Sequence, residues 1–355
     1  MFINKNQKKY LNPKVMSPIR IGLVGCGRIS KVHLKTINKL KTHFKLISVC
    51  DSNKQRSLTA GQNYKVRNYY NLKEMLKNEN LDIVSVCTPS GYHFENSMEI
   101  AKKNINVITE KPMAILSEHG NKMSREFKKR KLKLFVVKQN RNNPSIKVLK
   151  KAIEKKRFGK IHMINANVFW TRKQEYYDLD DWRGTKKYDG GALMNQASHF
   201  VDLLTWLNGP VKSVFAQEYK FRNIECEDTA TVNIKWKSGA IGTLNVTMLT
   251  YPKNFEGSIT VIGEKGLAKV GGIAINKIEC WEFEKEIKED KDINKLSYDT
   301  SSVYGKGHLD FYMNVYDTII KKTKIHTDGN EGYKSLNFIN SCYESFKKKK
   351  IIEIN

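Results

Sequence analysis

The stretch IRIGLVGCGRIS, residues 19–30, decides the fold of this 355-residue chain. Its first half is an apolar run typical of a buried strand, and its second half has the pattern G-x-G-x-x-S, with an amphipathic segment directly after it. In a turn between strand and helix, Gly25 permits a tight bend, and Gly27 lets the backbone approach a pyrophosphate at the helix N-terminus. The stretch therefore predicts a dinucleotide-binding turn, with Arg28 and Ile29 among the cofactor-binding residues.

An acidic residue at the end of the next apolar run supports this prediction. Asp51 follows Ser30 by 21 residues, where a carboxylate would accept hydrogen bonds from the adenosine ribose and repel a 2′-phosphate. Glycine-rich turns alone are common, and Asp51 could instead be the N-cap of the following helix. Strand, glycines and spacing together favour the cofactor interpretation, and they favour NAD over NADP.

The first 140 residues alternate short apolar runs with segments of helical length. We expect strands at residues 19–24, 46–50, 83–87, 106–109 and 134–137. Nearly continuous apolar strands that alternate with helices indicate a parallel sheet covered on both faces. The fold class predicted for this half is therefore α/β, a doubly wound Rossmann domain.

The pattern changes after a helix that is expected from Pro144 to about Arg157, with Asn143 as its N-cap. Longer runs rich in β-branched residues, several with period-two alternation, predict an open and largely antiparallel sheet. These runs are residues 162–172, 213–221, 229–236, 241–249, 258–262 and 278–283. Helices expected at about 190–208, 308–322 and 332–346 would cover one face. We predict a disordered extension at 1–17, an NAD-binding domain at 18–143, and a substrate-binding and oligomerisation α/β domain at 144–355.

Composition excludes several classes of protein. The formal net charge is +27, but the lysines are scattered and no nucleic-acid-binding motif accompanies them, so we expect no nucleic-acid partner. Residues 1–17 contain no apolar stretch, so they predict neither a signal peptide nor a membrane anchor. The six cysteines form no C-x-x-C pair, which fits a reducing cytoplasm. No His, Cys or carboxylate group has metal-ligand spacing, so no metal is expected.

Four motifs in order give the chain a family resemblance. They are TPSGYH at 88–93, EKP at 110–112, WRG at 182–184 and the segment from Gly190-Gly191 to Asp202. With these motifs the chain resembles the Gfo/Idh/MocA family of sugar and inositol dehydrogenases over residues 18–350. The resemblance implies that the nicotinamide lies where the fourth and fifth strands end. The further cofactor-binding residues that it implies are Thr88, Ser90, His93, Glu110, Lys111, Gln139, Trp182 and Arg183.

A closer likeness lies in longer stretches of the chain. They are VKQNRNNP at 137–144, NVFWTRKQEYYD at 167–178, WRGTKKYDGGALMNQASHFVDLL at 182–204 and TMLTYPKNFEGSITVIGEKG at 247–266. They are similar to the UDP-N-acetylglucosaminuronate 3-dehydrogenases of bacterial O-antigen synthesis. In that group, NAD takes a hydride from C3 of the sugar, and the 3-keto product goes to an aminotransferase that uses pyridoxal phosphate.

Asn195, His199 and Asp202 stand at i, i+4 and i+7 of the helix expected at 190–208, so their side chains would share one face. A lone helical histidine is more often structural than catalytic, but the resemblance implies that His199 contacts the reacting hydroxyl. Because imidazole titrates near neutrality, His199 is the predicted base. Asn195 stands where many family members carry aspartate, and a neutral amide cannot stabilise an imidazolium electrostatically. Lys111 is the other catalytic candidate, since an ammonium could hydrogen-bond the sugar hydroxyl and favour its alkoxide-like transition state.

Anionic groups of the substrate need cationic partners. Arginine can bind a diphosphate or a carboxylate through two hydrogen bonds. Besides Asn195 and His199, the candidate substrate-binding residues are Arg141, Arg172, Tyr176 and Lys253.

Three other functions remain open. They are oxidation of a free sugar or inositol, a redox-assisted NAD-dependent glycosidase, and a catalytically silent NAD-binding regulator, which the intact Lys111 and His199 disfavour. The resemblance implies two further partners. The first is 2-oxoglutarate, as a hydride acceptor that reoxidises NADH, and the second is the chain itself, in a homotetramer.

Overall fold

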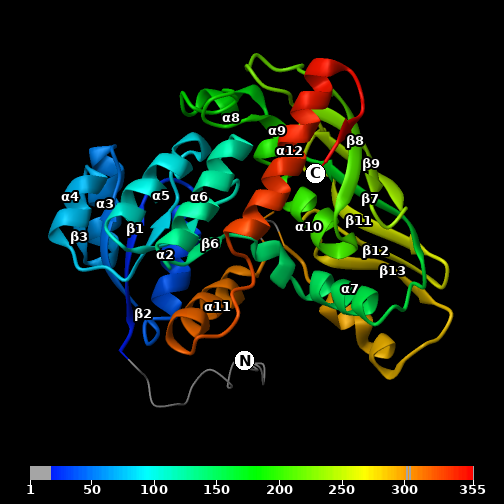
Figure 1. Ribbon diagram of the computed structural model, residues 1–355, viewed down its shortest axis with the longest axis horizontal. Helices are drawn as coiled ribbons and strands as arrows, with labels where there is room; N and C mark the ends of the chain where they lie inside the picture. Colours follow the sequence, from blue (N-terminus) through cyan, green and yellow to red (C-terminus); the bar gives the residue numbers. More distant parts are fainter. Residues whose placement is uncertain (1–16, 301–302, 304, 355) are drawn as a thin grey trace.

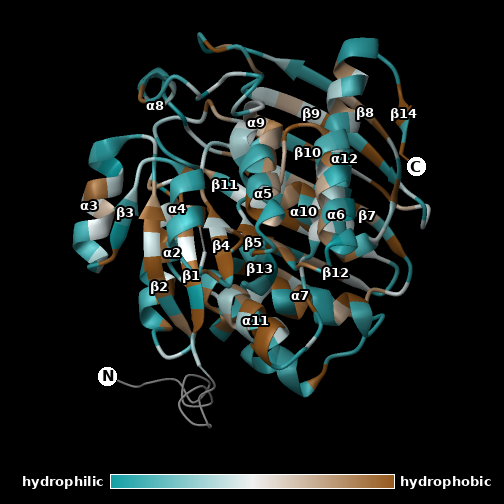
Figure 2. Ribbon diagram, turned by 60° about the vertical axis from the view of Figure 1, so that its left-hand side comes forward, coloured by the Kyte–Doolittle hydropathy of each residue, from teal (hydrophilic) through white to brown (hydrophobic). Residues whose placement is uncertain are grey.

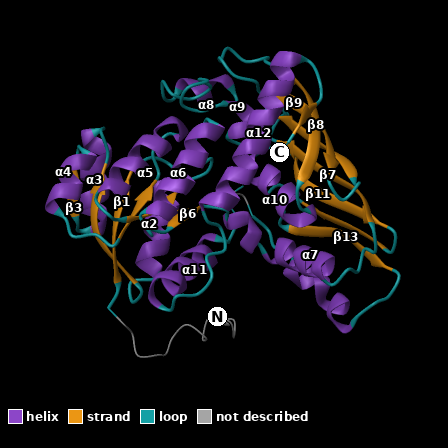
Figure 3. Ribbon diagram, viewed as in Figure 1, coloured by secondary structure: helices purple, strands orange, loops and turns teal. Residues whose placement is uncertain are grey.

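The computed structural model describes residues 17–300, 303 and 305–354. Apart from Ser17, the extension expected at 1–17 lies outside the described residues. Strands form two separate sheets, each covered by helices (Figure 3). Within the described ranges, no helix has both the length and the apolar character needed to cross a membrane.

The first sheet has six strands, all parallel, in the order β3-β2-β1-β4-β5-β6. The strands are β1 Ile19–Val24, β2 Phe44–Cys50, β3 Arg67–Tyr69, β4 Ile83–Val86, β5 Asn106–Thr109 and β6 Leu134–Val136. The helices of this half are α2 Ser30–Lys39, α3 Lys54–Tyr64, α4 Leu72–Asn78, α5 His93–Lys102 and α6 Ser117–Lys129, with short 3₁₀ helices η1 Ser90–Tyr92 and η2 Gln139–Asn142. The strand order reverses between β1 and β4, and a doubly wound sheet opens its binding crevice at that point.

The predicted strands of this half are confirmed because burial on both faces demands apolar residues. Ile21 and Leu23 of β1 are fully buried, and apolar strands contrast with the hydrophilic outer faces of the helices in Figure 2. Sequence analysis missed β3, since its three residues are polar and partly exposed.

The second sheet has eight strands in the order β13-β12-β11-β7-β10-β9-β8-β14. The strands are β7 Ile161–Phe169, β8 Val211–Tyr219, β9 Thr229–Trp236, β10 Ile241–Thr247, β11 Glu256–Gly263, β12 Gly266–Gly271, β13 Lys277–Phe283 and β14 Ile352–Glu353. The helices are α7 Pro144–Glu154, α8 Gln174–Asp178, α9 Gly191–Met194, α10 Ser198–Asn208, α11 His308–Ile320 and α12 Gly329–Lys348, with the 3₁₀ segment η3 Lys288–Leu296. Only β7 and β10 pair in parallel among these strands, so the predicted open, largely antiparallel sheet is confirmed.

One helix prediction is wrong in a way that shapes the site. The helix expected at 190–208 is two helices, α9 and α10, and residues 195–197 form the break between them. Asn195 is the C-cap of α9, so it does not share a helical face with His199 and Asp202. Strands β12 and β14 were not predicted either, because β12 is bounded by glycines and β14 has two residues.

Helix α11 belongs to the first domain in space although it lies late in the chain. Phe311, Tyr312 and Val315 share a buried apolar cluster with Ile21 of β1 and Phe44 of β2. In Figure 1, α11 (orange) lies beside α2 (blue), below the first sheet. The boundary near residue 143 therefore divides the sequence, but a helix from after this boundary packs against the first domain.

Candidate active site

A large cleft opens at the carboxyl ends of β1, β2, β4 and β5, with residues of the second domain on its far side. Its volume is about 2280 Å³, well above the roughly 300–1,000 Å³ of a pocket for one small molecule. A dinucleotide and a second ligand therefore fit together. Every residue predicted to bind the cofactor lines this cleft, and so do Arg172, Tyr176, Asn195 and His199.

The two glycines of the β1–α2 turn play different steric roles. Gly25 has φ +91°, and a Cβ there would lie 2.5 Å from the backbone carbon of Cys87. Around a Cβ on Gly27 there is no atom within 4 Å among the described residues. Gly25 is thus needed for the fold, whereas Gly27 leaves open space beside the N-terminus of α2. A pyrophosphate fits this space, where backbone N–H groups and the helix dipole favour an anion.

Asp51 holds the adenosine end of the cleft together. Its Oδ2 accepts from the Cys26 N–H at 2.7 Å, and its Oδ1 accepts from the Asn53 N–H at 2.8 Å. Asn53, not Asp51, is the side-chain N-cap of α3, because it accepts from the Arg56 N–H. The alternative interpretation of Asp51 as an N-cap is therefore wrong. The β1–α2 turn, the N-terminus of α2 and the Asp51 carboxylate together form a site that fits NAD.

Lys111 joins the two domains at the other end of the cleft. Its Nζ donates to the backbone oxygen of Asn195 at 2.9 Å and to Asn195 Oδ1 at 3.2 Å. Burial lowers the pKa of the Lys111 ammonium, although the Glu110 and Asp189 carboxylates oppose this effect. The break between α9 and α10 exposes the Asn195 backbone oxygen to this contact. Residues that are 84 positions apart thus form one polar centre.

His199 lies in the same centre as a neutral imidazole. Burial and then the positive charge of Lys111 lower the pKa of His199 to about 3. Its Nε2 is 3.0 Å from Nε2 of Gln139, whereas its Nδ1 has no hydrogen-bond partner among the described residues. Because the Gln139 amide nitrogen can only donate, Nε2 carries the lone pair of this neutral ring and Nδ1 carries the hydrogen, so Nε2 is the nitrogen that can accept a proton.

The structure does not support substrate binding by Arg141. Its guanidinium is buried and donates to both oxygens of Asp202, at 2.8 and 2.7 Å. It also pairs with Glu331 of α12 at 2.9 Å, and the side chain is not part of the cleft lining. Asp202 is 3.5 Å from Lys138 Nζ as well. These buried charges neutralise one another beneath His199, so Arg141 has a structural role.

Arg172, Tyr176 and Arg183 form a cationic wall on the second-domain side of the cleft. The Tyr176 ring has the Arg183 guanidinium 4.5 Å and the Arg172 guanidinium 5.4 Å from its centroid. Arg183 also donates to the Tyr176 hydroxyl at 2.8 Å and stacks over Trp182. Arg183 also pairs with the Asp180 carboxylate at 3.0 Å, whereas Arg172 pairs with no carboxylate among the described residues. A stacked, partly exposed guanidinium group such as that of Arg172 is suited to bind an anion.

Two other predicted residues have different surroundings from those expected. Lys253 is exposed and lies outside the cleft lining, whereas its neighbour Asn254 lines the cleft. His93 lines the cleft but is buried, with its ring nitrogens 2.7 Å from the Pro112 oxygen and 2.8 Å from the Thr88 oxygen. His93 therefore holds the loops after β4 and β5 together.

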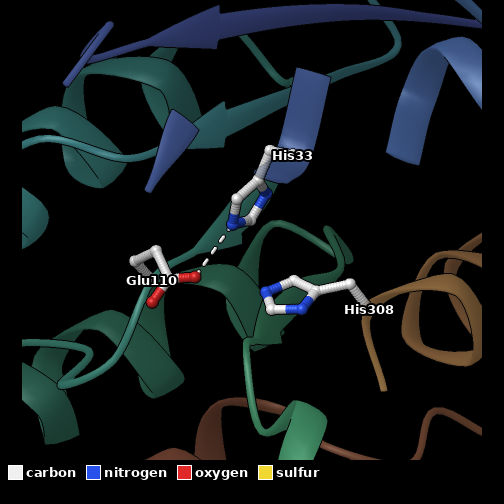
Figure 4. A group of neighbouring side chains, drawn as sticks. All are labelled: His33, Glu110 and His308. Atoms are coloured by element: carbon white, nitrogen blue, oxygen red, sulfur yellow. Dashed lines mark hydrogen bonds and ion pairs between the residues drawn. The ribbon is translucent and has the colours of Figure 1, made fainter. Parts of the chain in front are cut away.

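Glu110 lies at the base of the cleft, beside His33 and His308 (Figure 4). The potential ligand atoms of this trio lie within 4.8 Å of one another, but His33 Nε2 is only 2.8 Å from Glu110 Oε1. Two ligands at about 2.0 Å from a tetrahedral metal stand roughly 3.3 Å apart. We therefore interpret His33 and Glu110 as an ion pair. Glu110 Oε2 accepts from the Lys111 N–H at 3.1 Å, so the pair supports the Lys111 loop.

Sequence analysis missed residues that line or support the cleft. Asp189 is buried behind Asn195 and accepts from its amide. Arg56 of α3 reaches across to Asp180, with a separation of 2.7 Å. Each contact depends on how the folded chain brings these segments together, so no local pattern could have shown it.

Comparison with known proteins agrees with this geometry. Residues 19–138 match the family model of the oxidoreductase NAD-binding Rossmann fold, and residues 150–354 match that of the oxidoreductase C-terminal α/β domain. The chain belongs to the Gfo/Idh/MocA oxidoreductase family. It is an oxidoreductase, and its Rossmann domain is of the NAD-binding type.

Two solved relatives of this oxidoreductase are similar over nearly the whole chain. The WlbA dehydrogenase of Chromobacterium violaceum, in complex with NADH and UDP-GlcNAcA, is 47% identical with a TM-score of 0.92, over 97% of this chain and 98% of that one. The WlbA dehydrogenase of Bordetella pertussis, with the same ligands, is 44% identical with a TM-score of 0.91, over 97% and 99%. Myo-inositol 2-dehydrogenase of Thermotoga maritima is 28% identical over 70% of this chain and 74% of that protein.

Gly25→Ala and Gly27→Ala should separate folding from cofactor binding in this oxidoreductase. We expect Gly25→Ala to lower the free energy of unfolding by more than about 2 kcal/mol, because its Cβ would overlap backbone at a strained φ. Gly27→Ala should unfold normally but lose at least about tenfold in NAD affinity, since its methyl group fills the phosphate space. Urea unfolding and NAD titration check both. Normal NAD binding by Gly27→Ala would contradict the assignment.

The Asp51 carboxylate should set the choice between NAD and NADP. We expect the oxidoreductase to bind NAD at least about tenfold tighter than NADP, and Asp51→Ala to shrink that ratio, because a 2′-phosphate would meet the carboxylate. The ratio is the quantity to measure, since the variant also loses the Cys26 and Asn53 hydrogen bonds. Glu95→Ala, on the surface, is the control. Equal affinities in the unmodified protein would refute the role of Asp51.

The His33–Glu110 pair should make stability depend on pH. Although burial opposes it, the contact with His33 brings the pKa of Glu110 to about 2, against roughly 4.3 in an unfolded chain. The stabilisation by the carboxylate is thus present above the unfolded pKa and lost as pH falls through the folded one. Burial lowers the pKa of His33, but Cys87, Tyr312 and Glu110 together raise it above its usual value, so its contribution is lost only at higher pH.

Glu110→Gln should therefore lower the free energy of unfolding at pH 6 by more than about 1 kcal/mol. The difference from the unmodified protein should shrink as the pH falls from about 6 to about 3, as urea titrations at each pH would show. A difference that is constant over this range would mean that Glu110 is not held as a carboxylate.

Proposed function

We propose that this oxidoreductase removes a hydride from C3 of UDP-N-acetylglucosaminuronate with NAD as the acceptor. The observation that carries the proposal is the similarity, over 97% of the chain, to two WlbA dehydrogenases whose structures hold NADH and UDP-GlcNAcA. The volume of the cleft and its cationic wall support a second, anionic ligand beside the dinucleotide.

The residues at this end of the cleft would each have a separate role in the oxidation of an alcohol. Bound NAD would supply the hydride acceptor. The Lys111 ammonium would donate a hydrogen bond to the C3 hydroxyl and stabilise the negative charge that develops on its oxygen. His199, a neutral imidazole whose Nε2 carries the lone pair, would accept the hydroxyl proton at that nitrogen. Asn195 holds Lys111 from the side of the second domain and completes the catalytic group.

The cationic wall would select for an acidic nucleotide sugar. Arg172 and Arg183 both contact Tyr176, and Lys111 adds a further positive charge, while Arg183 is also paired with Asp180 at 3.0 Å. A diphosphate and a sugar carboxylate are anions that guanidinium groups bind through paired hydrogen bonds. Free inositol carries no charge, so this wall favours the UDP-sugar over the inositol substrate of the 28% identical relative.

The wider setting follows from this substrate. We propose that the 3-keto product passes to an aminotransferase in the synthesis of O-antigen or a related surface polysaccharide, in the cytoplasm. The second sheet offers an open face of polar strand residues, such as the Asn167 and Asn245 pair at 3.0 Å. This face would pack against another copy of the chain in a homotetramer.

A panel of substrates tests the proposed function. The oxidoreductase would be incubated with NAD and UDP-N-acetylglucosaminuronate, UDP-N-acetylglucosamine, UDP-glucuronate, glucose or myo-inositol, and products would be identified by mass. We expect the acidic acetamido sugar to give a product lighter by the mass of two hydrogen atoms. Preferred oxidation of inositol or a free sugar would replace the proposal with the alternative dehydrogenase. Glycoside cleavage that requires NAD would indicate the redox-assisted glycosidase.

Lys111→Met and His199→Asn should each lower kcat by about a hundredfold or more, since groups that transfer or stabilise protons contribute on that scale. NAD should still bind, because the glycine turn and Asp51 are unchanged. Lys128→Met, on an exposed helix face, is the matched control. Steady-state rates and NAD titrations check the prediction. Near-normal turnover by either variant would remove that residue from the mechanism.

We further propose that 2-oxoglutarate reoxidises the NADH held by the enzyme, since a site for a sugar carboxylate, with Arg172 and Lys111 nearby, could also seat a small dicarboxylate. With catalytic NAD, the UDP-sugar alone should give little product, and added 2-oxoglutarate should give much more, with equimolar 2-hydroxyglutarate. His199 would then return the proton that it took, as microscopic reversibility requires. Free NADH that accumulates under excess NAD regardless of 2-oxoglutarate would refute recycling but leave the dehydrogenase function intact.

A further inference from the structure

Lys111 is held by a neutral residue. Both hydrogen-bond acceptors of its Nζ belong to Asn195, and no carboxylate among the described residues pairs directly with this ammonium. Immediately behind Asn195 lies Asp189, which is 1% exposed. A charge that is so deeply buried needs partners.

Asp189 uses both carboxylate oxygens. Oδ1 accepts from Asn195 Nδ2, and Oδ2 accepts from the Gly184 N–H at 2.7 Å. Because Asn195 Oδ1 faces the Lys111 ammonium, the amide nitrogen must point away from it, and Asp189 receives it there. The amide orientation is therefore fixed from both ends, and ammonium, amide and carboxylate form one hydrogen-bonded chain.

We propose that Asp189 is a positioning residue of the dehydrogenase. Acting through the Asn195 amide, it orients the Lys111 ammonium and supplies the negative charge that Asn195 lacks. The proposal rests on the proposed function, in which Lys111 contacts the reacting hydroxyl. It adds a residue outside the cleft lining, so Asp189 would touch neither substrate nor cofactor.

Asp189 also links Lys111 to the loop that carries the cationic wall. The Gly184 N–H that it binds follows directly on Trp182 and Arg183, both of which line the cleft. The φ of Gly184 is +68°, a conformation that favours glycine and sets the turn. One buried carboxylate thus fixes the ammonium and the Trp182–Gly184 turn relative to each other.

Several charges act on Lys111. Burial lowers its pKa, Glu110 and Asp189 raise it, and Arg172 lowers it. The other titratable groups that interact with Lys111 are His93, Lys138 and His199. Removal of the charge on Asp189 should therefore make the Lys111 amine easier to deprotonate, whereas a merely structural role would leave its protonation unchanged.

An exchange of two residues tests the proposal. In Asp189→Asn, the new amide faces two N–H donors, Gly184 N–H and Asn195 Nδ2. In Asn195→Asp, the new carboxylate faces the carboxylate of Asp189. The double variant exchanges the positions of the amide and the carboxylate in the hydrogen-bonded chain that starts at Lys111. The carboxylate introduced at position 195 accepts from Lys111 and from the amide introduced at position 189, whose oxygen accepts from Gly184.

The kinetic outcomes of this exchange are distinct. Each single variant should lower kcat by about tenfold or more, as small misplacements at a reacting centre do. The double variant should recover to within about fivefold of the unmodified enzyme, because every donor in the chain again faces an acceptor.

Competitive acetylation, read by mass spectrometry of the Lys111 peptide, gives a readout that needs no substrate. At a pH where most of the amine is protonated, Asp189→Asn should label Lys111 at least about threefold faster, because the labelling rate follows the deprotonated fraction. The double variant should restore the slow rate. Asp178→Asn, an exposed residue on α8, removes the same charge without the contact and should change neither kcat nor labelling. Thermal unfolding and NAD titration verify that each variant is folded.

Unchanged kcat and labelling in Asp189→Asn would overturn the proposal. The same holds if the reduction of kcat in the double variant equals the product of the reductions in the two single variants. If the unmodified enzyme oxidises none of the UDP-sugars, the proposed function fails, and the labelling rates alone then decide whether Asp189 controls Lys111.

Discussion

The hydrogen bonds from Lys111 to Asn195 are the contacts on which the rest of the site depends. An ammonium at the carboxyl edge of a parallel sheet needs acceptors, and here the second domain provides them. The break between α9 and α10 provides a backbone oxygen for this contact, and both Lys111 and Asn195 line the cleft. The contact that joins the two domains is therefore also part of the candidate catalytic group.

The buried charges beneath this centre are arranged in pairs. Glu110 with His33 at the base of the cleft, and Asp202 with Arg141 outside its lining, are buried ionised groups, and an unpaired charge there would be costly. These pairs come from elements of both domains and both halves of the chain. They fix the loop of Lys111 and the helix of His199.

Local patterns in the sequence sufficed for much of this architecture. The apolar run before Gly25 and the position of Asp51 predicted the first domain, because both signals arise within about 35 residues of chain. Long-range partners could not be predicted in the same way. Arg141 was expected to bind substrate. No local sequence pattern shows that its guanidinium forms ion pairs with Asp202 and Glu331. Asp189 was missed for the same reason, and an uninterrupted helical pattern concealed the break at Asn195.

The central claim is that the hydride leaves C3 of an acidic UDP-sugar. It is tested most directly with UDP-N-acetylglucosaminuronate that carries deuterium at C3 only, followed by mass analysis of sugar and cofactor after one turnover. The account predicts that the deuterium appears in the reduced nicotinamide and is absent from the sugar product. Deuterium retained in an oxidised sugar would place the reaction at another carbon, and an unreacted sugar would contradict the assignment of the substrate.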